Sequence, residues 1–375
     1  MIVNKLCCIV VLVIFLTGCS DQRIVEQAGF INALGLDLFN KEEYEKNRTL
    51  HVTASIPQVD PDAQKKREVI STDAKIDKEA MLNLARKTNR IIASGKIKVI
   101  LFGKDLAEYG IREDIDTFAR DPIFGRQIKI AVVEGTASEI MKPDFPEKPR
   151  SSIYIDELLE KETKMNSIPE ATLFQFQRDI NDKGRDPSAP ILKLVEQEVM
   201  VDGIALFRDD QYVTKLEPYL SRYFFFLNGD FSAGSINLKF EEEGKNEPVQ
   251  LMFSSLKNAR DISATYNNKD DITVDIVVRV EGSPLEYNGS KDLSKPEDQK
   301  FLEQKIEQHV KKVSDDIIKM LQDNKVDSLG LGRYVRNKMS FQEWEQMNWY
   351  DEVYPNVKVN VDVQAKVKNY GIKSN

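Results

Sequence analysis

The N-terminal apolar segment places the strongest constraint on what this chain can fold into. Residues 6–16 are eleven consecutive apolar residues, preceded by the single cation Lys5 and followed by the small and polar residues 17–23. A helix of eleven residues covers about half of a ~30 Å hydrocarbon core, which is too short to span a membrane. This length and these flanks are typical of a cleavable signal peptide. We therefore expect residues 1–18 to be removed and the fold to be built from residue 19 onward.

The predicted cleavage site ends in Leu16-Thr17-Gly18-Cys19, which resembles the lipobox of bacterial lipoproteins. The resemblance implies a diacylglyceryl thioether on Cys19 and cleavage before it, with residues 19–25 as a tether. The alternative is an ordinary secretory signal that happens to carry a cysteine at the cut. A buried acyl chain contributes about 0.8 kcal/mol per CH₂, and two chains on one sulfur suffice for stable attachment. The lipid on Cys19 is therefore the expected membrane anchor.

Cysteine use and charge exclude several classes of function. The three cysteines are Cys7, Cys8 and Cys19, so the processed chain has no free thiol for catalysis, disulfide formation or metal binding. A net charge of −8 disfavours nucleic acid and anionic headgroups as partners. With 41% hydrophobic and 30% charged residues, the composition indicates a folded ectodomain of more than one domain.

Strand and helix patterns alternate in the first half of the chain, which predicts an α/β or α+β arrangement. Expected strands are 28–36, 49–56, 98–102 and 128–133, and expected helices are 77–93, 105–109, 113–120 and 137–141. The charged segment 40–48 is interpreted as a hairpin loop, and 60–66 as a polar loop.

Prolines and glycines indicate where the chain divides. Pro143, Pro146 and Pro149 predict a loop, followed by helices at 153–162 and 169–181. The loop 184–190 is the expected main boundary. We predict an N-terminal α/β domain over 26–190, with a subdivision near 143–150, and a C-terminal α+β domain over 191–375.

The second half has the pattern of hairpins and one long helix. Strands are expected at 198–206, 211–213, 235–240, 249–256, 272–280 and 357–367. Thr214 with Glu217 predicts a capping box for a helix that reaches 227, and Ser294 with Glu297 predicts another for a helix over 296–322. The apolar residues of that helix recur at helical spacing. The C-terminal half is thus expected to be an antiparallel or mixed sheet with one long helix.

The order of motifs resembles the Ger(x)C family of spore germination lipoproteins, the C subunits of nutrient germinant receptors. The first half carries Leu16-Thr17-Gly18-Cys19, Ala33-Leu34-Gly35-Leu36-Asp37, the run Ile100–Ala107 with Gly110-Ile111, and Gly184-Arg185-Asp186-Pro187 with Pro190. The second half carries Gly203–Phe207, Gly330-Leu331-Gly332, Trp344, Trp349 and Tyr354-Pro355. One departure is Asp21-Gln22-Arg23, where the family usually has Trp-Asp shortly after the lipidated cysteine.

The resemblance implies a non-catalytic subunit on the outer face of the spore inner membrane. Its partners would be two integral-membrane subunits, A and B, and nutrient binding in the family is attributed to these partners, particularly B. It implies no catalytic or ligand-contacting residue and no cofactor. The alternative class is a lipid-anchored solute-binding protein, which would need a cleft between two lobes built from parallel βαβ units.

Residue types that carry chemistry are scarce. The two histidines are His51, within a strand pattern, and His309, at the edge of the apolar stripe of the long helix, where a half-buried structural role is favoured. No Gly-x-Ser-x-Gly motif and no zinc-ligand spacing accompanies them. Gly330-Leu331-Gly332 lacks the preceding strand and third glycine of a phosphate loop, which favours a turn at a helix start. No metal or cofactor site is predicted.

Aromatic residues are the remaining candidates for contact with a partner. The run 223–226 is Tyr-Phe-Phe-Phe, for which core packing is favoured over an interface. Trp344 and Trp349 are the conspicuous candidates for partner anchors. The competing interpretation is that both pack against the final strand.

Overall fold

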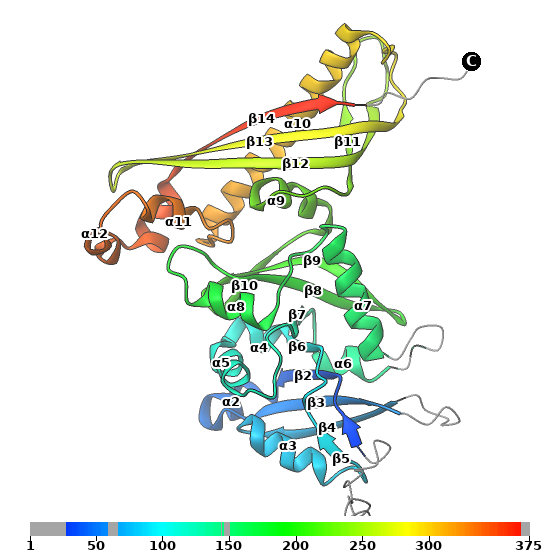
Figure 1. Cartoon of the computed structure of the whole chain (residues 1–375), viewed down its shortest axis with the longest axis vertical. Coiled ribbons are helices and arrows are strands. Elements are labelled where there is room, and N and C mark those ends of the chain that lie inside the picture. Colours follow the sequence, from blue (N-terminus) through cyan, green and yellow to red (C-terminus); the bar gives the residue numbers. More distant parts are fainter. Residues whose placement is uncertain (1–27, 59–66, 144, 146–150, 369–375) are drawn as a thin grey trace, which may run out of the picture.

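The computed structural model describes residues 28–58, 67–143, 145 and 151–368. Figure 1 shows an elongated molecule in which two sheets follow one another along the long axis. The predicted signal peptide, Cys19 and the predicted loop over 60–66 lie outside the described residues.

The larger sheet has eight strands in the order β10-β9-β8-β7-β6-β2-β3-β4. Neighbours from β2 through β6 and β7 to β8 are parallel, and the pairs toward both edges are antiparallel. The strands are β2 (Ala33–Leu38), β3 (Leu50–Pro57), β4 (Arg67–Ala74), β6 (Val99–Gly103), β7 (Lys129–Val133), β8 (Ser188–Val195), β9 (Glu198–Arg208) and β10 (Gln211–Leu216).

Helices cover both faces of this sheet, which explains the continuous apolar runs of its central strands. One core cluster joins Ile100 and Phe102 of β6 to α3 (Asp77–Ala85), α4 (Lys104–Tyr109), α5 (Arg112–Arg120) and α8 (Leu173–Ile180). A second cluster joins Val99 and Leu101 to α6 (Ala137–Met141) and α7 (Ser151–Lys164). Successive residues of β6 therefore point into different cores. A parallel pair, β1 (Ala28–Phe30) and β5 (Ile91–Ala93), lies at the same end of the molecule.

The smaller sheet has the order β11-β12-β13-β14. β11 (Ser235–Phe240), β12 (Val249–Asn268) and β13 (Asp271–Tyr287) are antiparallel, whereas β14 (Lys358–Val367) is parallel to β13. The long helix α10 (Pro296–Asp323) packs on this sheet, and its Glu303 and Glu307 accept the amides of Val367 and Ala365 at 3.0 Å each. These side chains satisfy donors that an edge strand would otherwise leave unpaired.

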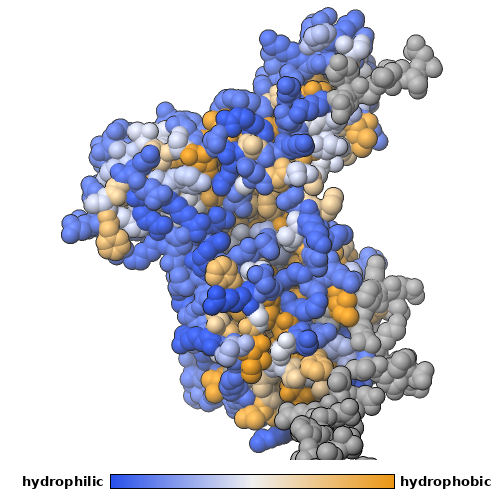
Figure 2. Space-filling model, in the orientation of Figure 1, coloured by the Kyte–Doolittle hydropathy of each residue, from blue (hydrophilic) through white to orange (hydrophobic). Residues whose placement is uncertain are grey.

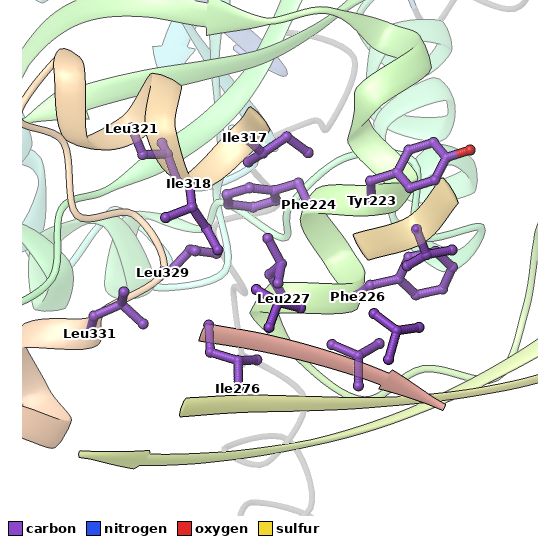
Figure 3. Packing of buried hydrophobic residues seen from close by; sticks show 14 of the residues in the cluster. Tyr223, Phe224, Phe226, Leu227, Ile276, Ile317, Ile318, Leu321, Leu329 and Leu331 are labelled. Atoms are coloured by element: carbon purple, nitrogen blue, oxygen red, sulfur yellow. The ribbon is translucent and has the colours of Figure 1, made fainter. Parts of the chain in front are cut away.

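The helix α9 (Ser221–Asn228), preceded by the 3-10 turn η2 (Pro218–Leu220), fills the space between α10 and the smaller sheet. Figure 3 shows its Tyr223, Phe224, Phe226 and Leu227 among Ile317, Ile318 and Leu321 of α10 and Ile276 of β13. Core packing of the aromatic run is confirmed: three of its four members are buried, and Phe225 is partly buried against the same core. The predicted mixed α/β class, with a C-terminal mixed sheet and one long helix, is confirmed.

Several local predictions were wrong. The segment 40–48 contains a helix, α2 (Lys41–Asn47), whose N-cap Asn40 accepts the amide of Glu43 at 2.7 Å. The helix expected over 77–93 ends at Ala85, and the chain then forms β5. The helix expected over 169–181 begins at Leu173, where Thr172 and Gln175 form a capping box.

Neither predicted capping box of the second half forms. Thr214 lies in β10, where backbone pairing with β9 replaces the cap. Ser294 donates to Asp292 at 2.7 Å, and α10 starts after Lys295 without a side-chain cap.

The observed division between the two sheets does not coincide with the predicted domain boundary. The boundary proposed at residues 190 and 191 falls within β8, and β8 to β10 continue the larger sheet to Leu216. Residues 217–234, which contain η2 and α9, lead to the smaller sheet. That sheet is not built from repeated βαβ units, because three of its four strands are antiparallel.

Candidate functional site: a polar junction between the two sheets

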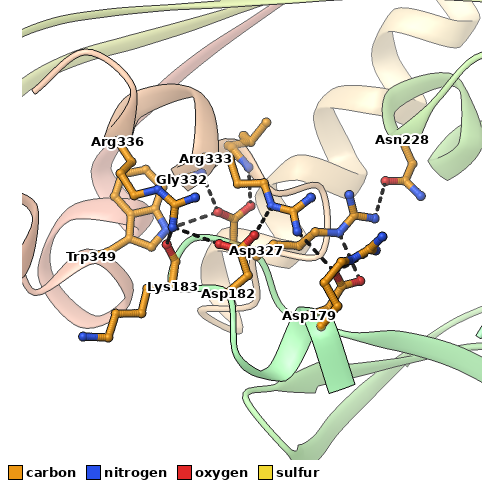
Figure 4. A network of polar contacts seen from close by, with 12 residues as sticks. Asp179, Asp182, Lys183, Asn228, Asp327, Gly332, Arg333, Arg336 and Trp349 are labelled. Atoms are coloured by element: carbon orange, nitrogen blue, oxygen red, sulfur yellow. Dashed lines mark hydrogen bonds and ion pairs between the residues drawn. The ribbon is translucent and has the colours of Figure 1, made fainter. Parts of the chain in front are cut away.

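The loop after α8 meets the segment after α10, and the two sheets are joined there. Residues 182–187 come from the larger-sheet part, and residues 326–336, including α11 (Leu331–Arg336), come from the smaller-sheet part. Figure 4 shows this contact. We call its polar side chains the junction network; they are Asp179, Asp182, Arg185, Asp186, Asp327, Arg333, Arg336 and Trp349.

Two buried carboxylates lie at the centre of the network. Asp186 accepts the amides of Asp209 at 2.8 Å and Asp327 at 2.7 Å. Asp327 accepts the amides of Leu331 at 2.8 Å and Gly332 at 2.7 Å. Because their donors come from the β9–β10 hairpin, the turn after α10 and the start of α11, the pair fixes three segments relative to one another.

Burial dominates the titration of both carboxyls. It raises the pKa of Asp186 to about 6 against the effect of its two amide donors. It raises the pKa of Asp327 to about 8, with a further increase from the nearby charge of Asp186. The protonation of the junction network is therefore expected to change near neutral pH.

Ion pairs surround this centre. Arg333 contacts Asp182 at 2.5 Å and Asp179 at 3.2 Å, and Arg336 contacts Asp182 at 2.9 Å. Arg185 donates to Asn228 at 3.2 Å. Both arginines of α11 thus reach acids of α8 and its following loop, and they hold α11 against the larger-sheet part.

Glycines allow the two backbones to touch. Gly184 has φ +127°, and a Cβ on it would lie 2.9 Å from the carbonyl carbon of Gly332. A Cβ on Gly332 would lie 2.7 Å from the Cα of Gly184 and 2.7 Å from Nε1 of Trp349. Gly330 has φ +71° and is the N-cap of α11, so the predicted helix-start turn is confirmed.

Trp349, a member of the network, and the neighbouring Trp344 are both buried, at 3% and 4% exposure. Their ring centroids are 5.4 Å apart, and Trp349 is 5.6 Å from the buried Tyr354. Trp349 also donates to Asp327 at 3.1 Å. The structure thus gives both indoles a packing role. In this conformation neither offers appreciable surface, and partner contact through them remains a prediction.

The histidines lie in separate structural settings. His51 of β3 contacts Asp73 of the adjacent β4 at 2.6 Å, and His309 of α10 contacts the Tyr223 hydroxyl at 2.9 Å. Within the described ranges no group of three or more His, Cys, Asp and Glu side chains is arranged to hold a metal. The described helices also include none long and apolar enough to cross a membrane.

Sequence reasoning identifies part of the junction but misses its centre. Asp186 stands out only as part of a family motif, and no pattern singles out Asp327. In the sequence each resembles an ordinary loop acid, and 141 positions separate them. The available signal was their position beside glycine-rich turns, Gly184 before Asp186 and Gly330 with Gly332 after Asp327.

Comparisons with known proteins agree over nearly the whole chain. Two family models match the chain. Residues 21–194 match the family described as spore germination protein N-terminal domain, and residues 202–371 match the family described as spore germination B3/GerAC like, C-terminal. Spore germination protein GerQC of Bacillus cereus is 22% identical over 96% of this chain and 97% of its own. Spore germination protein KC of Bacillus subtilis (strain 168) is 21% identical over 97% of this chain and 94% of its own length.

The crystal structure of the GerBC protein shares the fold, with a TM-score of 0.58 and 15% identity over 90% of this chain and 97% of that one. The two matched regions and this fold define a two-part spore germination protein. The chain belongs to the Ger(x)C family and has a role in spore germination.

Proposed function

We propose that the protein is a non-catalytic, lipid-anchored subunit of a spore nutrient germinant receptor, required for nutrient-triggered germination. It would act by assembling with the integral-membrane A and B subunits on the outer face of the spore inner membrane. The observation that carries this proposal is the match to both family regions, residues 21–194 and 202–371. The Leu16-Thr17-Gly18-Cys19 sequence supports the lipid anchor.

Action through surfaces, rather than turnover of a substrate, fits the settings of the reactive residue types. His51 and His309 each contact a neighbouring side chain in a structural arrangement. The acids of the junction network bind backbone amides and arginines of the same chain. In this proposal the junction network fixes how the two parts are presented to the membrane partners.

Replacement of Cys19 tests the anchor. Cys19→Ala should abolish incorporation of a fatty-acid analogue and release the protein from the membrane fraction, because it removes the acceptor sulfur. Cys8→Ala is the matched control, since it removes a thiol within the predicted signal peptide and should leave labelling intact. Persistent labelling of Cys19→Ala would contradict the anchor.

Assembly is tested separately by recovery from spore membranes. The lipidated protein should co-purify with the A and B subunits, and spores that lack it should fail to germinate in response to nutrient. Normal nutrient-triggered germination in its absence would overturn the proposed function.

A further inference from the structure

The flank of the molecule between α7 and the smaller sheet is hollowed, as Figure 2 shows on the right of the view. A cavity of about 580 Å³ lies there, lined by η2, the start of α9, β11 and α10, with Ser167 after α7. We call it the flank cavity. An adjoining hollow of about 400 Å³ shares Ser167, Pro218 and Ser221 with it. Both lie where the two parts of the molecule meet, a common position for ligand sites.

The lining of the flank cavity is cationic in a protein of net charge −8. Its cations are Arg222 and Lys239, and it contains no carboxylate, while Glu162 lines the adjoining hollow and its charge acts on Arg222. His309 also lines the cavity, but burial lowers its pKa, so it adds no fixed positive charge. Arg222 forms no ion pair with any described residue. Its guanidinium donates to the carbonyl of Ala233 at 3.1 Å and lies 5.5 Å from the ring centroid of Phe231. A guanidinium has five donors, so the described residues accept only part of its hydrogen-bonding capacity.

A buried hydroxyl in the same lining also lacks a partner. Ser221 is 3% exposed, and its Oγ has no hydrogen-bond partner among the described residues. Buried hydroxyls are normally paired, and one without a partner in a cavity wall is a candidate contact for a bound group. Ser221 is also the first residue of α9, which continues directly from η2, and its backbone amide donates to the carbonyl of Pro218.

The remaining lining is suited to the rest of a small molecule. Ile236 and Val313 are apolar, and Tyr219 is 73% exposed. The hydroxyl of Tyr223 is engaged by His309 at 2.9 Å, which fixes both side chains in the lining.

We propose that the flank cavity binds a small molecule through an oxyanion, a carboxylate or a phosphate. Arg222 supplies the charged contact, the Ser221 hydroxyl donates a second hydrogen bond, and Lys239 adds positive charge. The site is separate from the junction network and goes beyond the proposed assembly with membrane subunits.

The test uses a chain without residues 1–18 and with Cys19→Ser, which retains every described residue. Its thermal unfolding is followed with inorganic phosphate, butyrate or chloride at equal ionic strength, and with neutral butanol. A saturable rise in Tm with phosphate, butyrate or both is expected, with no rise in chloride or butanol. Phosphate and butyrate distinguish the two oxyanion sources.

Variants locate the binding. Arg222→Gln should weaken anion binding, measured by calorimetry, about tenfold or more, because it removes the charged donor. Ser221→Ala should weaken it by a smaller factor, and Arg222→Lys should retain part of it. Arg126→Gln is the matched control, since Arg126 also lies over a phenylalanine, 5.9 Å from the Phe174 ring, outside the cavity. Stabilisation equal to that in chloride, or undiminished in a folded Arg222→Gln protein, would overturn the proposal.

Discussion

At the scale of single residues, Asp327 and Asp186 couple the junction to pH. Their pKa values of about 8 and about 6 exceed the ordinary value of 3.8. Between the ordinary value and these raised values, the folded protein therefore binds more protons than the unfolded chain. The resulting stability is fully present below about pH 4 and is lost as the pH rises through 6 and 8. The contribution of these two groups to the free energy of unfolding should therefore fall toward alkaline pH.

Urea unfolding of Asp327→Asn across this range tests the coupling. The variant should be less stable than the parent, and its pH dependence should be flatter. If the asparagine oxygen accepts from Gly332 and Trp349, its NH₂ faces the amide donor of Leu331. A difference of one pKa unit between the folded and unfolded states corresponds to about 1.4 kcal/mol of the free energy of unfolding. Asp261→Asn, at a side chain 70% exposed, is the control and should keep the parent's pH dependence. An unchanged slope in Asp327→Asn would show that Asp327 is ionised throughout.

Gly332→Ala should destabilise the protein by about 1–3 kcal/mol. The added Cβ would meet the Cα of Gly184 and the Trp349 indole, each at 2.7 Å, and neither backbone nor buried ring can move aside cheaply. Gly125→Ala is the control, because a Cβ there meets nothing within 4 Å. Chemical denaturation should separate the two variants; equal stability would mean that the junction relaxes without cost.

At the scale of elements, the five-residue helix α6 depends on the strand beside it. A helix this short has little stability of its own. Asp37 at the end of β2 accepts the amides of Ala137 at 2.6 Å and Ser138 at 2.9 Å, and Thr136 with Glu139 forms a capping box. The aspartate thus joins the helix start to the larger sheet.

Asp37→Ala should lower the free energy of unfolding by about 1–3 kcal/mol, since two buried amides lose their acceptor. Asp37→Asn keeps one acceptor oxygen and should cost less. Urea unfolding compares them, and an alanine variant as stable as the parent would show that water replaces the carboxylate.

Elements with a regular apolar pattern were predictable from the sequence, and those without one were not. The strand at β6 was evident because it is buried on both faces. The helix α2 was missed because none of its residues is buried, which leaves no apolar periodicity. The strand expected over 249–256 was predicted too short, because β12 continues to Asn268. Ser255 has φ +55° at a register shift with β13, and the alternation of apolar and polar residues is interrupted there.

The junction network could not be predicted from apolar patterns, for a different reason. Its contacts join α8 and its loop to α11 across about 150 positions, as between Asp182 and Arg333. Only the family motifs pointed to this region, and they did so without indicating that Gly184 and Gly332 touch.

At the scale of the whole molecule, stability rests on packing and the junction rather than on cross-links. The cysteines are Cys7, Cys8 and Cys19, so a chain that begins after Cys19 contains no thiol. We expect this chain to fold as a monomer, and its Tm should be unchanged by reductant or by a chelator. Calorimetry with and without each reagent checks this, and a large loss of stability on chelation would reveal a structural metal.

The position of β14 at the very end of the fold has a consequence for synthesis. The larger sheet contains its last strand once Leu216 has been made, whereas the smaller sheet waits for residues 358–367 to pair with β13 and pack on α10. Until residues 358–367 have emerged, the apolar side of α10 lacks this cover, because domains fold as their residues become available. A product truncated before Lys358 would carry one complete sheet and one exposed core, which makes it a substrate for proteases that degrade incompletely folded proteins.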